Sequence, residues 1–119
     1  MRSHELGKEG EAFALEFLRQ QGYSILTTNY RAKMGEIDVI AREGDTVVFI
    51  EVKTRKEDGW DAFEAVHPLK QRKMFRAAEQ YLVETFGKVE VRARFDVLAV
   101  SLIKDGTLKG DLLKDAFMR

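Results

Sequence analysis

Two acidic residues and a lysine interrupt apolar, strand-like segments in the middle of the chain. Asp38 lies within Gly-Glu-Ile-Asp-Val-Ile at 35–40, and Glu51 and Lys53 lie within Val-Val-Phe-Ile-Glu-Val-Lys at 47–53. An ion that leaves water without a partner is costly, so these charges require compensation. A divalent cation bound by the two acids, with the ammonium facing a phosphate group, would provide it. The pattern therefore indicates a site for a divalent metal and a phosphate.

Strand geometry predicts that the two acids meet. Side chains alternate between the faces of a strand, so Glu51 and Lys53 project on the same side. If Gly44 and Asp45 form the tip of a two-residue hairpin, Asp38 falls opposite Glu51, with Cβ atoms about 5 Å apart. A different turn would move the partner by a residue or two. Carboxylates at that separation repel each other unless a cation lies between them.

Composition restricts the class of protein. A chain of 119 residues with 45% apolar content can form one compact domain, which we place at 1–119. It has no cysteine, which excludes disulfides and thiolate metal ligands. Twenty basic and 20 acidic residues give no net charge, which argues against a histone-like protein. The charged beginning lacks a signal-peptide core and no stretch approaches the roughly 20 apolar residues of a membrane span, so we expect a cytoplasmic protein without a membrane partner.

The elements that must position these residues can be predicted from periodicity and turn residues. We expect a helix over about Glu5–Gln21 stopped by Gly22, and three strands that form a meander. A second helix should start at Pro68 and end at Gly87, after a loop around Gly59. The strands are expected at Tyr23–Tyr30, Glu36–Arg42, the segment around Val47–Lys53 and within Val89–Leu102, with a last strand or short helix at Thr107–Phe117. The predicted class is α/β, with a central mixed β-sheet flanked by helices in the order α-β-β-β-α-β.

A basic segment follows the acidic motif. Between His67 and Arg76 the chain carries four cations and no acid, and Arg55 lies just upstream. This predicts a patch that faces phosphates, with Arg55, Lys70 and Lys73 as nucleic-acid contacts. The alternative is a solvated helix face. Lys70 has two further alternatives, because it could pair with Glu64 or with Glu51.

Two aromatic residues of the expected loop, Trp60 and Phe63, could stack on bases or simply pack over the core. The motif residues also have structural interpretations. Asp38 and Glu51 could be buried acids satisfied by lysines, and Lys53 could be the ion-pair partner of Asp38. Glu36 shares the face of Asp38, as an accessory acid or as its support.

The pattern Gly-Glu-Ile-Asp, twelve residues, then Glu-Val-Lys resembles the PD-(D/E)XK nuclease superfamily, which has a restriction-endonuclease-like fold. A longer set of motifs extends over nearly the whole chain, namely Gly7, Gly10-Glu11-Ala12, Gly22-Tyr23, Asn29-Tyr30-Arg31, Gly35-Glu36-Ile37-Asp38, Phe49-Ile50-Glu51-Val52-Lys53-Thr54-Arg55 and Arg94-Phe95-Asp96. With these motifs the sequence resembles the uncharacterised YraN family, for which endonuclease activity is inferred and which is distantly similar to archaeal Holliday-junction resolvases.

The resemblance implies a role for each matching residue. Asp38 and Glu51 match the two metal-binding acids, with the Val52 carbonyl as a further ligand for Mg²⁺ or its substitute Mn²⁺. Lys53 matches the lysine that orients or activates the attacking water and offsets charge on the phosphate. Glu11 matches an acid that some members contribute from the first helix, although a position on the helix surface is an equal alternative. The first motif has isoleucine before Asp38 where the superfamily name has proline.

The expected function is thus a metal-dependent DNA endonuclease that hydrolyses phosphodiester bonds, with branched, Holliday-junction-like DNA as a candidate substrate. A homodimer would suit a two-fold branched junction, because two active sites must reach two symmetric strands. The main alternative is a nuclease fold retained as a nucleic-acid-binding or partner-binding module without catalysis. A purely structural interaction protein is the third alternative.

Overall fold

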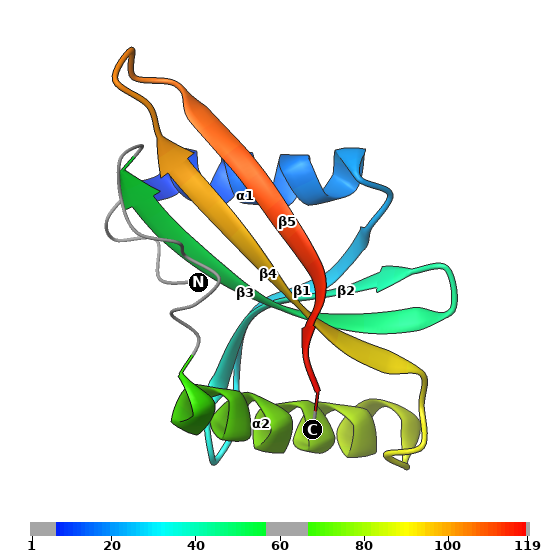
Figure 1. Cartoon of the computed structure of the whole chain (residues 1–119). Helices are drawn as coiled ribbons and strands as arrows, with labels where there is room; N and C mark the ends of the chain where they lie inside the picture. The colour runs from blue at the N-terminus through cyan, green and yellow to red at the C-terminus, as the bar shows by residue number, and fades with distance from the viewer. Residues whose placement is uncertain (1–6, 57–66, 119) are drawn as a thin grey trace.

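One mixed sheet and two helices make up the computed structural model, which describes residues 7–56 and 67–118 (Figure 1). The elements are α1 (Gly7–Gln20), β1 (Ser24–Arg31), β2 (Glu36–Glu43), β3 (Thr46–Lys56), α2 (Pro68–Phe86), β4 (Ala93–Leu102) and β5 (Leu108–Phe117). Within this part of the chain, neither helix combines the length and the apolar content needed to cross a membrane.

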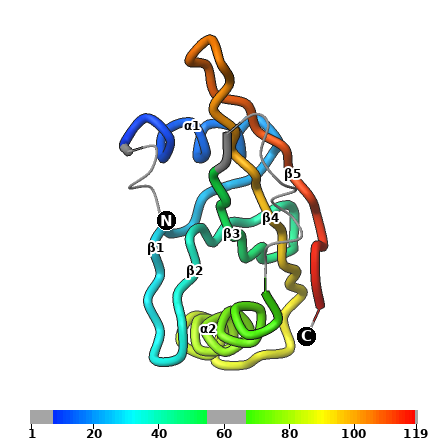
Figure 2. The backbone as a smooth tube through the Cα atoms, turned by 60° about the vertical axis from the view of Figure 1, so that its left-hand side comes forward, coloured from blue at the N-terminus to red at the C-terminus, as the bar shows by residue number. Residues whose placement is uncertain are grey.

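The strands follow one another across the sheet in chain order, β1-β2-β3-β4-β5. Pairing is antiparallel everywhere except between β3 and β4, which run parallel. A parallel pair requires a long crossover, and α2 lies in the segment of chain that provides it. Figure 2 shows α1 and α2 on opposite sides of the strands.

The two faces of the sheet bury separate apolar clusters. Ala14 and Leu18 of α1 pack with Val48 and Ile50 on one face. The alternate residues of β3, Val47 and Phe49, pack with α2 on the other face. The period-two alternation of β3 thus feeds both cores, which explains why its sequence is apolar on both sides. Glu51 continues the series that faces α2.

Helix α2 has defined ends. The His67 side chain accepts a hydrogen bond from the Leu69 amide at 3.1 Å, and Pro68 occupies the first turn, where a missing N–H costs nothing. At the other end Gly87 adopts a left-handed conformation with φ 76°, and its amide donates to the Val83 carbonyl. Both predicted limits of this helix are confirmed.

A buried hydrogen-bond network fastens β4 to its neighbours. Asp96, with 0% exposure, accepts from the Tyr23 hydroxyl at 2.6 Å, Arg94 Nε at 3.0 Å and the Asp115 amide at 2.9 Å. Arg94 also reaches Glu43 at 2.6 Å. Burial opposes the charge of Arg94, but its hydrogen bonds to Asp96 and Glu43 outweigh burial and raise the pKa of the guanidinium. This network therefore stabilises the sheet, because it connects β4 to Asp115 of β5, to Glu43 of β2 and to Tyr23 just before β1.

The α/β class, the mixed sheet, the meander β1-β2-β3 and the helix between β3 and β4 are confirmed. The predicted order α-β-β-β-α-β lacks the last strand, since the chain reads α-β-β-β-α-β-β; of the two alternatives for Thr107–Phe117, the strand is confirmed and the short helix is not. The segment Leu108–Phe117 is a strand because it pairs with β4 along nearly its whole length. The expected loop around Gly59, with Trp60, Phe63 and Glu64, lies outside the described residues.

Candidate functional site

The β2–β3 hairpin has the predicted register. Its pairs run from Glu43 with Thr46 back to Val39 with Ile50, around a left-handed Gly44 at φ 59°. The next position along each strand holds Asp38 and Glu51. These are among the few buried charged side chains of the described residues, with residue exposures of 3% and 2%.

The carboxylate of Asp38 replaces a backbone hydrogen bond between the strands. The regular pairing of β2 with β3 ends at Val39 and Ile50, and beyond it the Val52 amide donates to Asp38 Oδ2 at 2.8 Å. A hydrogen bond to a carboxylate is stronger than a neutral one and fixes its direction. Asp38 and the backbone of Val52, two of the predicted metal-binding positions, are therefore joined directly.

Glu51 meets a cation from α2. Lys70 Nζ lies 2.8 Å from Glu51 Oε2, and the two side chains are 23% and 2% exposed. Of the alternatives for Lys70, the structure shows the pairing with Glu51, whereas its contact with a phosphate stays a prediction. The ammonium offsets the charge of one buried acid, and the Val52 amide offsets part of the charge of the other.

Three other predicted residues are basic, and they lie on β3 and α2. Lys53 is half-buried and follows Glu51 by two positions on β3, which puts both on one face. Among the described residues no ion pair links it to Asp38. Lys73 is exposed on α2. Arg55 lies near the end of β3, and its side chain is outside the described part.

The two other acids of the prediction are not gathered at the pair. Glu11 is half-buried on α1, the helix that packs on the face of the sheet opposite α2. Glu36 begins β2, where it is exposed and lies 3.9 Å from Arg31. Within residues 7–56 and 67–118 no three His, Cys, Asp or Glu side chains are grouped to hold a metal. The structure thus places Asp38 and Glu51 at neighbouring positions of β2 and β3, and among the described residues it does not group Glu11 or Glu36 with them.

The donor set of the pair still suits one kind of ion. Mg²⁺ is commonly bound through one or two carboxylates together with waters and substrate phosphates, not by a full cage of side chains. Asp38 and Glu51 supply two hard oxygen donors at neighbouring positions, and Lys70 shows that a positive charge is accommodated beside them. The residues present therefore fit Mg²⁺ or Mn²⁺.

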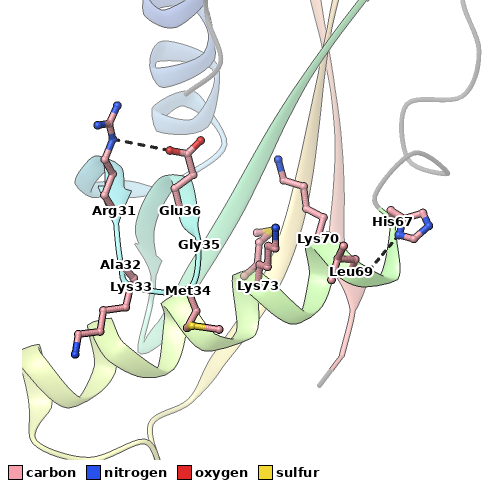
Figure 3. A pocket seen from close by; sticks show the side chains of 11 residues that line it. Arg31, Ala32, Lys33, Met34, Gly35, Glu36, His67, Leu69, Lys70 and Lys73 are labelled. Carbon is pink, nitrogen blue, oxygen red and sulfur yellow. Dashed lines mark hydrogen bonds and ion pairs between the residues drawn. The ribbon is translucent and has the colours of Figure 1, made fainter.

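A groove of about 900 Å³ opens between the β1–β2 turn and the first turns of α2 (Figure 3). Lys70 lines it and also contacts Glu51, so the groove adjoins the carboxylate pair. The lining residues are Arg31, Ala32, Lys33, Met34, Gly35, Glu36, His67, Leu69, Lys70, Lys73 and Met74. Sequence reasoning missed Arg31 and Lys33 as part of one surface with α2. The signal that could have indicated this surface is the pair of cations, Arg31 and Lys33, at alternate positions of the sequence Arg31-Ala32-Lys33.

The fold and site together define an α/β protein in which a mixed sheet carries two adjacent buried carboxylates beside a basic groove. The chain belongs to the uncharacterised protein family UPF0102, whose model matches residues 10–100. This confirms the resemblance to the YraN-type family. The matched segment includes Asp38, Glu51, Lys53 and Lys70.

Relatives from several bacteria align over most of the chain. A UPF0102 protein of Caldicellulosiruptor saccharolyticus is 45% identical over 98% of this chain and 100% of its own length. One from Syntrophus aciditrophicus is 47% identical over 93% of this chain and 87% of its own. A third, from Geotalea daltonii, is 44% identical over 94% of this chain and 88% of its own.

Proposed function

We propose that the protein is a metal-dependent DNA endonuclease with a restriction-endonuclease-like fold. The observation that carries this proposal is the placement of Asp38 and Glu51 at adjacent buried positions of β2 and β3, with the Lys70 ammonium 2.8 Å from Glu51. Burying charged side chains in this way costs desolvation free energy. A buried ion pair seldom stabilises a fold more than apolar side chains of similar volume would, so its presence next to a groove favours a functional role.

Each residue has a distinct task in this reaction. Asp38 and Glu51 would hold Mg²⁺, with the Val52 carbonyl as a further donor, and the hydrogen bond from the Val52 amide keeps Asp38 oriented. The bound ion would supply an activated water and neutralise charge on the phosphodiester. Lys53, on the face of Glu51, orients the attacking water and offsets charge on the phosphate. The resemblance to the nuclease superfamily implies that water attacks phosphorus and the 3′ oxygen leaves, so the expected products are 5′-phosphate and 3′-hydroxyl ends.

Branched DNA is the candidate substrate within this proposal. A four-way junction has two symmetric strands to cut, and a homodimer would present two copies of the site to them. The basic groove beside the carboxylates provides the electrostatic attraction that a protein with no net charge needs at its binding surface.

A second candidate is a nuclease fold that binds nucleic acid or a protein partner without cleaving. The Lys70–Glu51 contact favours it, because an ammonium that already neutralises Glu51 reduces the need for a metal. The two candidates differ in the effect of removing charge at Asp38. Cleavage requires the carboxylate, whereas binding of phosphate improves or stays unchanged when an acid is removed.

The test is cleavage of labelled duplex, single-stranded and four-way-junction DNA with Mg²⁺ or Mn²⁺, followed by analysis of the ends. Asp38→Asn and Lys53→Met are compared with Asp45→Asn, which alters an exposed acid at the hairpin tip. We expect a loss of about a hundredfold or more in the first two and none in the control. Parent protein that binds junctions but never cleaves them would establish the binding module instead. Absence of both binding and cleavage would refute both candidates.

A further inference from the structure

We infer that the groove between the β1–β2 turn and α2 binds a single strand of nucleic acid that continues from the carboxylate pair. This inference deepens the proposed function and rests on it. It assigns a binding role to the turn at residues 32–34, which lies between two of the motifs and belongs to neither. It also specifies an unpaired strand as the part of the substrate that this surface recognises.

The walls of the groove are fixed against each other. The Ala32 amide donates to the Gly35 carbonyl at 2.8 Å, which closes the turn. Gly35 lies so close to α2 that a Cβ atom there would stand 2.8 Å from the Lys73 carbonyl oxygen. The Lys33 amide also donates to Gln80 Oε1 at 3.1 Å. A groove held in this way is largely formed before its ligand arrives, which lowers the entropic cost of binding.

Positive charge lies on both walls. Arg31 and Lys33 come from the strand side, and Lys70 and Lys73 come from α2 (Figure 3). Among the lining residues that the structure describes, Glu36 is the single acid. Its pair with Arg31 spans 3.9 Å between side chains that are 48% and 85% exposed, so water screens it and the pair contributes little. The groove as a whole therefore attracts a phosphate backbone.

Apolar side chains lie among these cations. Met34 is 59% exposed and Leu69 is 49% exposed, and both line the groove. An unpaired strand offers phosphates to the cations and uncovered base faces to such apolar surface. A duplex hides its base faces in the stack and would present phosphates alone. The mixture of cations and exposed apolar side chains therefore favours a single strand.

Lys70 joins this groove to the carboxylates. Its ammonium contacts Glu51, and in Figure 3 its side chain extends from α2 toward the sheet. A strand lying in the groove would consequently pass beside Glu51. The phosphate presented to Asp38 and Glu51 would then belong to the same strand, at the point where it leaves the groove.

The experiment measures binding of a short fluorescein-labelled oligothymidylate by anisotropy in EDTA, over a series of salt concentrations. Lys73→Gln is compared with Arg76→Gln, because both residues are exposed cations of α2 but only Lys73 lines the groove. We expect Lys73→Gln to weaken binding about threefold to tenfold and to reduce the slope of log K against log salt by about 0.7. We expect Arg76→Gln to bind like the parent, and a duplex of equal length to bind more weakly than the single strand.

Equal effects of the two substitutions, or tighter binding of the duplex, would overturn this inference. The result is independent of cleavage. Loss of binding in Lys73→Gln from a parent that never cleaves would support the groove and refute the nuclease. Cleavage by a parent whose strand binding is unchanged by Lys73→Gln would support the nuclease and refute the groove.

Discussion

The ammonium of Lys70 lies 2.8 Å from the carboxylate of Glu51, joining the first turns of α2 to a buried position of β3. The same lysine lines the basic groove. A divalent cation bound at Glu51 would take over the compensation that Lys70 provides, and the ammonium would then be available to a phosphate. Lys70 thus belongs to both surfaces, so a metal ion bound at Glu51 would change the positive charge that the groove offers to a phosphate.

The first prediction concerns this contact. Lys70→Met removes the ammonium from a carboxylate that is 2% exposed, and we expect the free energy of unfolding to fall by about 1–3 kcal/mol. Lys73→Met, at an exposed position of the same helix, should change it by less than about 0.5 kcal/mol. Urea denaturation measures both.

Mn²⁺ should raise the Tm of Lys70→Met more than that of the parent, since the site then lacks a competing cation. Equal shifts would contradict this competition.

Asp38 has two roles that different substitutions separate. Asp38→Asn retains an oxygen that can accept from the Val52 amide, so we expect it to preserve stability while removing the charge. Asp38→Ala leaves that amide without this acceptor in a buried place, which should cost about 1–3 kcal/mol. Thermal denaturation together with Mn²⁺ calorimetry checks this, with metal binding lost in both variants. If the two variants prove equally stable, the hydrogen bond is not what holds the strands there.

Local sequence rules were enough to predict the carboxylate pair. The two-residue turn at Gly44 and Asp45 fixes the register of β2 against β3, and that register brings Asp38 level with Glu51. The partner of Glu51 could not be chosen in the same way. Lys70 comes from another element, and only the position of α2 over the sheet decides whether this lysine pairs with Glu51, with Glu64 or with a phosphate.

The groove, like the partner of Glu51, could not be predicted from the sequence. Its existence depends on how closely the β1–β2 turn approaches α2, and this is set by Gly35 against the Lys73 backbone. No periodicity in either segment encodes that distance. Strand β5 was ambiguous for a related reason, since its pattern of buried and exposed residues is irregular and pairing with β4 decides its structure.

Gly35 should tolerate substitution poorly because of this close approach. In Gly35→Asn the new Cβ would meet Lys73 backbone and side-chain atoms at 2.8–3.1 Å, so the turn or α2 must shift, at a cost of about 1–3 kcal/mol. Gly44→Asn is the matched comparison. Gly44 has φ 59° and open space around it, and asparagine accepts left-handed conformation better than most residues, so a smaller loss is expected. Equal losses would show that the contact is not restrictive.

Strand binding provides a second measurement on the same pair of variants. A shift of the turn away from α2 separates the two cationic walls, so Gly35→Asn should bind oligothymidylate more weakly than Gly44→Asn. Binding should be compared at a temperature where both variants are fully folded. Unchanged binding by Gly35→Asn would mean that the spacing of the walls does not matter to the ligand.

The last prediction follows from the charge network at the opposite end of the hairpin. Hydrogen bonds from Lys114 and Arg94 lower the pKa of Glu43 below its ordinary value. A carboxyl whose pKa is lower in the folded state than in the unfolded chain stabilises the fold above the unfolded pKa of about 4.5. That contribution is lost as the pH falls through the folded pKa. Glu43→Gln should therefore be less stable than the parent at neutral pH, and the difference should shrink as the solution is acidified below about pH 4.5. Urea denaturation between neutral and acid pH, with Glu90→Gln as an exposed control, measures it. A difference that stays constant with pH would mean that Glu43 contributes by packing and not by its charge.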